Sequence, residues 1–194
     1  MRLFIALNLP PAVREAVWAA AAPLRELQLP VNWVRPDGLH LTLKFLGDVA
    51  DTRESELHAA LAQAAGGEGK GGVAGASRSI PLALGGFGVF PDQRRPRVVW
   101  VGVEPVPALE LLQHRVEQAF APLGFPTEGR PFQPHVTLGR ATRDAEPQAF
   151  RGLADALARL ELAETVAVEA VDLMASTLQR GGAVYQVRRS EHLD

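Results

Sequence analysis

Apolar and polar residues alternate along two short segments, residues 40–43 and residues 135–138, which lie in different halves of the chain. Both segments read His, apolar, Thr, apolar. Alternation with a period of two is typical of a half-buried β-strand, because successive side chains point to opposite faces of a sheet. Each segment is therefore predicted to bury its leucine and valine side chains and to turn its His and Thr towards the other face.

Elsewhere, the spacing of apolar residues and the placement of proline and glycine predict the remaining elements. Helices are expected at residues 10–27, 53–65, 107–123 and 147–160. Strands are expected at residues 2–8, 31–35, 39–45, 80–89, 98–103, 132–140, 166–175 and 183–188. Several consecutive strands are joined by connections too short for a parallel crossover, so the sheets should be largely antiparallel or mixed.

This order of elements predicts the α+β class. Because the His-x-Thr pattern occurs once in each half, we expect residues 1–194 to form a single bilobal domain. Its two pseudo-symmetric lobes would each hold a mainly antiparallel sheet backed by helices, with an active-site cleft between them.

One segment, residues 66–79, is rich in glycine and has the composition of a flexible linker. Its glycine spacing matches neither the phosphate loop of nucleotide-binding proteins nor the dinucleotide-binding fingerprint. We therefore interpret the segment as a surface loop, whose role the sequence leaves open.

The composition is that of an ordinary globular protein, with 194 residues of which 47% are hydrophobic and 22% charged. The formal net charge of −2 provides no overall field that would attract a polyanion. The chain has no cysteine, which excludes disulfides, thiolate nucleophiles and thiolate metal ligands. No segment has the length of a membrane span or of a signal sequence, so we expect a cytoplasmic monomer with no membrane partner.

Two imidazoles on facing strands suggest acid–base chemistry. Near neutral pH one His can accept a proton while the other donates one. Cleavage of a phosphodiester needs both transfers, and a Thr hydroxyl can donate a hydrogen bond to a phosphate oxygen. The candidate site therefore contains His40, Thr42, His135 and Thr137. Either motif alone would be weak evidence, and the near symmetry of the pair leaves open which His is the acid.

Three basic residues near the motifs are further candidates for phosphate binding. Lys44 shares strand parity with Thr42, which places it on the cleft face, although a solvent-exposed lysine at a strand end is an equally good interpretation. Strict alternation would point Arg140 away from His135, so a role for Arg140 requires a bend or bulge near Gly139. Arg130 is a candidate for the rim of the cleft.

At this point the chain resembles a known family. Residues 33–47 and 130–140 are similar to the two signatures of the 2H phosphoesterase superfamily. They most resemble the bacterial and archaeal RNA 2′,3′-cyclic phosphodiesterases, historically called 2′-5′ RNA ligases. Residues 2–7, 173–176 and 182–185 also fit, so the resemblance extends over nearly the whole chain.

The resemblance implies a bilobal fold with antiparallel sheets along a central cleft. It implies metal-independent opening of an RNA 2′,3′-cyclic phosphate to a 2′-phosphomonoester, without a cofactor, at RNA 3′ ends. His40 would donate a proton to the leaving 3′ oxygen, and His135 would activate water. Thr42, Thr137 and Arg140 would hold the phosphate. Reversal of this chemistry would join RNA ends through a 2′-5′ linkage.

Other functions remain open from the residues alone. The same site would also suit small cyclic nucleotides or 2′-5′-linked oligonucleotides. A metal-dependent hydrolase, or a nucleotide-binding module without turnover, is a different class. Metal sites usually need three or four protein ligands, and no carboxylate recurs beside the two histidines.

Overall fold

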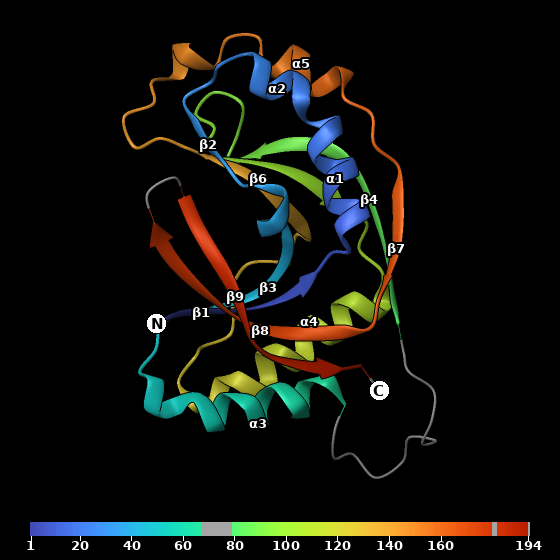
Figure 1. Cartoon of the computed structure of the whole chain (residues 1–194), viewed down its shortest axis with the longest axis vertical. Helices are drawn as coiled ribbons and strands as arrows, with labels where there is room; N and C mark the ends of the chain where they lie inside the picture. The colour runs from blue at the N-terminus through green and yellow to red at the C-terminus, as the bar shows by residue number, and fades with distance from the viewer. Residues whose placement is uncertain (67–78, 180–181, 194) are drawn as a thin grey trace.

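The computed structural model of this protein describes residues 1–66, 79–179 and 182–193 (Figure 1). The strands are β1 (Arg2–Asn8), β2 (Val31–Trp33), β3 (His40–Asp48), β4 (Ile80–Phe90), β5 (Val98–Val103), β6 (His135–Ala141), β7 (Glu164–Val168), β8 (Ala170–Gln179) and β9 (Gly182–His192). The α-helices are α1 (Pro11–Ala20), α2 (Ala22–Glu26), α3 (Glu54–Ala65), α4 (Pro107–Phe120) and α5 (Leu153–Arg159). Short 3₁₀ helices are η1 (Pro36–Gly38), η2 (Asp51–Arg53), η3 (Ala121–Leu123) and η4 (Pro147–Phe150). Most of the glycine-rich segment predicted at residues 66–79 lies outside the described residues.

Three predicted elements are divided differently in the structure. The helix expected at residues 10–27 is broken at Ala21 into α1 and α2. The helix expected at residues 147–160 begins as η4, and α5 starts only after Gly152, which has a φ of 82°. The single strand expected at residues 166–175 is two strands, β7 and β8, which pair with different neighbours. Apolar spacing alone does not reveal such breaks.

All strands of the described chain join one curled sheet in the order β7-β4-β5-β6-β3-β1-β8-β9, with β2 beside β6. Every pairing is antiparallel, as predicted. The sheet has two halves of four strands each along this order, and they meet where Leu41 of β3 pairs with Val136 of β6. The α+β class and the two-part arrangement are thus confirmed.

Helices α1 and α4 each pack against the opposite half of the sheet from the strand that precedes them in the chain. Figure 1 shows α3 and α4 side by side against the half that contains β1 and β8, whereas α1, α2 and α5 gather at the other half. Thus α1, which follows β1 in the chain, contacts β7, and α4, which follows β5, contacts β3. The apolar side chains consequently form one continuous main core. None of the helices in the described part of the chain is long and apolar enough to span a membrane.

The alternation in the two motifs matches the burial in the structure. Leu41 and Val136 are fully buried in the main core, whereas His40, Thr42 and Thr137 are only partly buried on the opposite face. The hydrophobic effect therefore fixes which face each His occupies, because turning a strand over would expose its leucines.

A β-bulge interrupts the alternation of β3. Ala6 pairs with Thr42 and Ile5 pairs with Lys44, so one extra residue is inserted in β3 between these pairs. The prediction that Lys44 shares the face of Thr42 is therefore wrong. Lys44 is only 3% exposed, and its Nζ lies 2.6 Å from Oε2 of Glu117 in α4 and 2.7 Å from the carbonyl oxygen of Pro126.

A matching bulge lies in β6. Trp100 of β5 pairs with Thr137 and Val99 pairs with Gly139, so Leu138 is the extra residue. The bulge returns Arg140 to the face of Thr137. The bend that a role for Arg140 required is thus present, one residue from where the sequence placed it.

The buried ion pair of Lys44 and Glu117 leads to a stability prediction. Lys44→Met should lower the free energy of unfolding by about 3–5 kcal/mol, because it leaves the Glu117 carboxylate buried without its cation. Adding Glu117→Leu should restore most of the loss. Urea unfolding measures both effects. The control is Arg189→Met, whose ion pair with Glu191 is half exposed and should contribute about 1 kcal/mol or less. An equally small loss for Lys44→Met would contradict this assignment.

Candidate active site

The motif side chains form a two-by-two array on one face of the sheet. Because Leu41 and Val136 are antiparallel partners, the next positions bring His40 beside Thr137 and Thr42 beside His135. These four residues all lie on the face opposite the two paired apolar residues. A pseudo-twofold axis therefore relates the two motifs, and their polar groups converge on one region between the strands.

His40 is fixed by its backbone and by two aromatic rings. Its Nδ1 lies 2.7 Å from the carbonyl oxygen of Gly38, and a carbonyl can only accept, so Nδ1 carries the proton. In the neutral ring, Nε2 then has a free lone pair. The rings of Phe4 and Tyr185 lie 4.8 and 4.9 Å away. Gly38 makes room for Tyr185, because a Cβ at Gly38 would lie 3.0 Å from that ring.

His135 is held in the same way by different neighbours. Its Nδ1 donates to the carbonyl oxygen of Gln133 at 2.8 Å, so its Nε2 is also the free nitrogen of the neutral ring. The ring of Phe90 lies edge-on at 5.0 Å, and Trp100 lies 6.5 Å away. Trp100 fits beside β4 because residue 88 is glycine, where a Cβ would lie 2.3 Å from the indole.

Both imidazoles are neutral at pH 7 in the free protein. Burial lowers the pKa of His40 from 6.5 to about 4, and the positive charges of Arg14 and Arg140 lower it further, against the opposing effect of the Gly38 carbonyl. Burial also lowers the pKa of His135, and Arg140 contributes in the same direction. Two neutral rings with free Nε2 atoms are therefore the resting state of the site.

Arg140 is the charge common to the whole array. Its side chain is exposed, and it takes part in none of the ion pairs within the described residues. Its field lowers the pKa values of His40, His135 and Tyr185. A guanidinium that acts on both halves of the site and has no carboxylate partner there is available to an anion.

The structure brings five of the seven predicted residues together. His40, Thr42, His135, Thr137 and Arg140 share one face, as described above. Lys44 lies on the other face of the sheet. Arg130 is exposed on the segment that leads into β6, and no hydrogen bond or ion pair of the described residues ties it to the motifs.

Comparisons with known proteins show the family to which the chain belongs. A family model described as the 2′-5′ RNA ligase superfamily matches residues 13–180. The chain belongs to this superfamily. The RNA 2′,3′-cyclic phosphodiesterase of Methanothermobacter thermautotrophicus is 30% identical over 185 residues, which cover 95% of each chain. The curated phosphodiesterase of the same name from Thermotoga maritima is 29% identical over 187 residues, 96% of this chain and 92% of its own.

Two solved structures have a fold similar to that of this chain. The protein TT0787 of Thermus thermophilus matches with a TM-score of 0.78 and 27% identity, covering 100% of this chain and 98% of its own. E. coli LigT complexed with 3′-AMP matches with a TM-score of 0.70 and 30% identity, covering 99% of this chain and 97% of its own. The chain therefore shares its bilobal α+β architecture with TT0787 and LigT.

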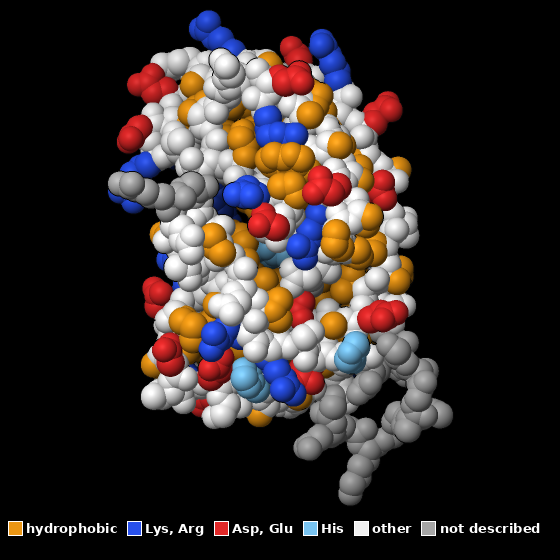
Figure 2. Space-filling model, in the orientation of Figure 1, with side chains coloured by type: hydrophobic (Ala, Val, Ile, Leu, Met, Phe, Trp, Pro, Cys, Tyr) orange, Lys and Arg blue, Asp and Glu red, His pale blue; other side chains and the backbone are white. Residues whose placement is uncertain are grey.

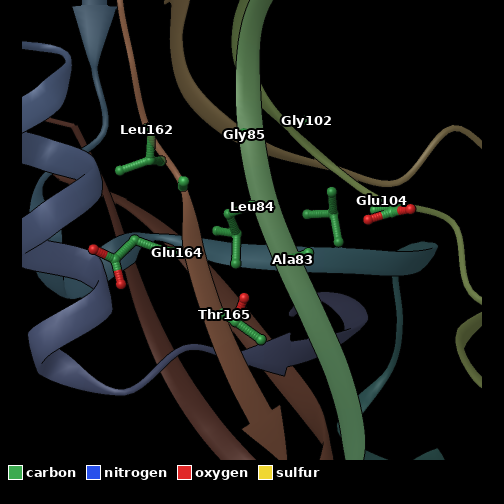
Figure 3. A pocket seen from close by; sticks show the side chains of 10 residues that line it. Ala83, Leu84, Gly85, Gly102, Glu104, Leu162, Glu164 and Thr165 are labelled. Atoms are coloured by element: carbon green, nitrogen blue, oxygen red, sulfur yellow. The ribbon is translucent and has the colours of Figure 1, made fainter.

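The structure has two cavities to consider, and only one of them is lined by a motif histidine. One, of about 370 Å³, is lined in part by His40 itself. The other, of about 430 Å³, lies between β4, β5 and β7, and its only charged lining groups are Glu104 and Glu164 (Figure 3). No motif residue lines this second cavity. The first cavity is thus the one connected to the chemistry.

Sequence reasoning missed the residues of the first cavity. Asn8, Arg14, Asp172 and Tyr185 come from the two ends of the chain and meet beside His40. The available signal was the carboxylate of Asp172 within the otherwise apolar residues 170–175 of β8, because burying a charge costs free energy unless it is paired.

The depressed pKa of His40 predicts a pH-dependent stability. Between about pH 6.5 and pH 4 the unfolded chain binds a proton at His40 that the folded protein does not, so this contribution to stability is complete above pH 6.5 and is lost as the pH falls towards 4. The limiting slope is about 1.4 kcal/mol per pH unit. Urea unfolding of the protein and of a His40→Gln variant, which should show a shallower slope, measures it. An NMR titration midpoint of His40 near 6.5 would contradict the burial of the ring.

Proposed function

We propose that this chain hydrolyses RNA 2′,3′-cyclic phosphates to 2′-phosphomonoesters by paired His acid–base catalysis, without a metal or cofactor. The observation that carries the proposal is the antiparallel array of His40, Thr137, Thr42 and His135, with Arg140 beside it. The names of the curated relatives support the same substrate class. Both motifs come from one chain, so the reaction needs no partner subunit.

Proton transfer begins at His135. Its neutral Nε2 accepts a proton from water while the water oxygen forms a bond to phosphorus. The bond between phosphorus and the 3′ oxygen breaks, and His40 donates its proton to that oxygen. The product is a 2′-phosphomonoester with a free 3′-hydroxyl, and proton exchange with solvent restores both imidazoles.

His40 must acquire a proton before it can act as the acid. In the free protein its pKa of about 4 leaves it neutral at pH 7. A phosphate anion beside the ring favours the imidazolium and raises its pKa. Substrate binding thus favours the protonated His40 that acts as the acid. The assignment of His40 as acid and His135 as base follows the family resemblance, and it places the more buried His40 at the leaving oxygen.

The remaining groups hold the phosphate. Thr42 and Thr137 lie beside the opposite motif's imidazole and can each donate a hydroxyl hydrogen bond to a non-bridging oxygen. Arg140 neutralises charge that develops on these oxygens. With a 5′-hydroxyl in place of water, the same transfers would form a 2′-5′ linkage, which is the ligation implied by the family.

Substitution of either motif His tests the proposal. His40→Ala and His135→Ala should each lower kcat for an RNA ending in a 2′,3′-cyclic phosphate by about 10²- to 10⁴-fold, because each removes one proton transfer. His114→Ala is the matched control, since His114 is exposed on α4 outside the array. Wild-type turnover should persist in EDTA. Full activity of either motif variant would refute the paired roles, and loss of activity in EDTA would refute metal independence.

Removal of the Arg140 charge should weaken substrate binding. Arg140→Met is expected to raise KM by about 10- to 100-fold, the equivalent of one charge-assisted hydrogen bond. It should also raise the pKa of His135, because the guanidinium lowers it. Steady-state kinetics and NMR titration measure these effects, with the exposed Arg151→Met as control. An unchanged KM together with an unchanged His135 titration would remove Arg140 from the site.

A further inference from the structure

The cavity beside His40 is lined by polar groups that the proposed chemistry does not use. A polar row crosses the sheet from β3 to β9 through His40, Asn8, Asp172 and Ser190. Asn8 is the strand partner of His40, and Ser190 is the strand partner of Asp172. From β3 to β8 is two strand spacings, about 10 Å, comparable with the reach from a ribose phosphate to the far edge of its base.

The buried carboxylate of Asp172 is the chemical centre of this row. Asp172 is only 6% exposed, and its Oδ2 accepts a 2.7 Å hydrogen bond from Nδ2 of Asn8. The Oδ1 atom of Asn8 accepts from Arg14 at 3.2 Å, which fixes the orientation of the amide. Arg14 also donates to the Asp37 carbonyl oxygen at 2.9 Å, so this guanidinium is engaged with the protein.

The cavity is therefore lined by two carboxylates, Asp37 and Asp172, and by one guanidinium, Arg14, which donates to Asn8 and to the Asp37 carbonyl oxygen. A carboxylate needs partners that donate hydrogen bonds, and it repels phosphate, which is attracted to Arg140 instead. The remaining lining includes Tyr185 and Met174, an aromatic ring and a thioether that suit the face of a planar ring. A planar ligand with a hydrogen-bond-donating edge matches both parts of the lining.

Figure 1 shows β8 and β9 crossing in front of β1, and β9 contacts η1. In the same orientation, Figure 2 shows acidic and basic side chains close together near the middle of this face.

We infer that this cavity binds the base of the nucleotide carrying the cyclic phosphate, and that Asp172 selects bases with an exocyclic amino group. The inference rests on the proposed function and specifies its substrate. Adenine has a 6-amino group and cytosine a 4-amino group that can donate to the carboxylate. Uracil and hypoxanthine instead present a carbonyl oxygen at the corresponding position of the ring, and two acceptors repel each other.

Two matched substrate pairs test the selection by kinetics. Cytidine and uridine 2′,3′-cyclic phosphates have the same ring size, as do the adenosine and inosine compounds. Wild-type kcat/KM should favour the amino member of each pair by about 5- to 100-fold, the range of one well-placed base contact. Asp172→Asn should bring both ratios close to one, since an amide can donate to a carbonyl oxygen as well as accept.

The exposed Asp48→Asn, on the end of β3 outside the cavity, is the matched control and should leave both ratios unchanged. Calorimetry with 2′-CMP and 2′-UMP on the His135→Ala protein measures the same preference without turnover. Equal turnover of both members of each pair, unaffected by Asp172→Asn, would refute the base selection while the proposed function stands. Turnover of none of the four, with equal binding of both monophosphates, would refute both.

Discussion

The geometry of the site depends on one backbone pairing, between Leu41 and Val136. Within the described residues it is the only pair of strand partners between β3 and β6, and both side chains are fully buried. A shift of either strand by one residue would move its His and Thr to the core face and its leucines to the cleft. The main core on one face therefore determines the position of the catalytic groups on the other.

The two bulges explain why alternation places Lys44 on the wrong face and why Arg140 nevertheless lies on the face of the motifs. Alternation predicts the faces of His40, Thr42, His135 and Thr137, because these residues precede the bulges. It is wrong for Lys44, which follows the extra residue of β3 and turns into the core. No composition signal marks the position of a bulge within Leu-Lys or Leu-Gly, so long-range pairing with β1 and β5 decides it.

The residues that surround His40 could not be predicted from the sequence, for a different reason. Local patterns predict strands and their faces, but not which strands become neighbours. The cavity combines the end of β1, the start of α1, and β8 and β9, which are separated by about 150 residues of chain. Likewise, α1 and α4 each pack against the half of the sheet that does not contain the preceding strand. This arrangement follows from packing of the whole chain rather than from any one segment.

The pseudo-symmetry of the motifs ends at the residue that each bulge turns towards the cleft. That residue is Arg140 in β6 and Phe45 in β3, each five positions after its His. Phe45 is 58% exposed, and its ring lies 6.1 Å from that of Phe4. One half of the cleft thus presents a cation and the other presents aromatic rings next to an acceptor-lined cavity. A nucleotide with an anionic phosphate and a planar base has the same polarity, so an almost symmetric acid–base pair acquires two distinct ends from the residues around it.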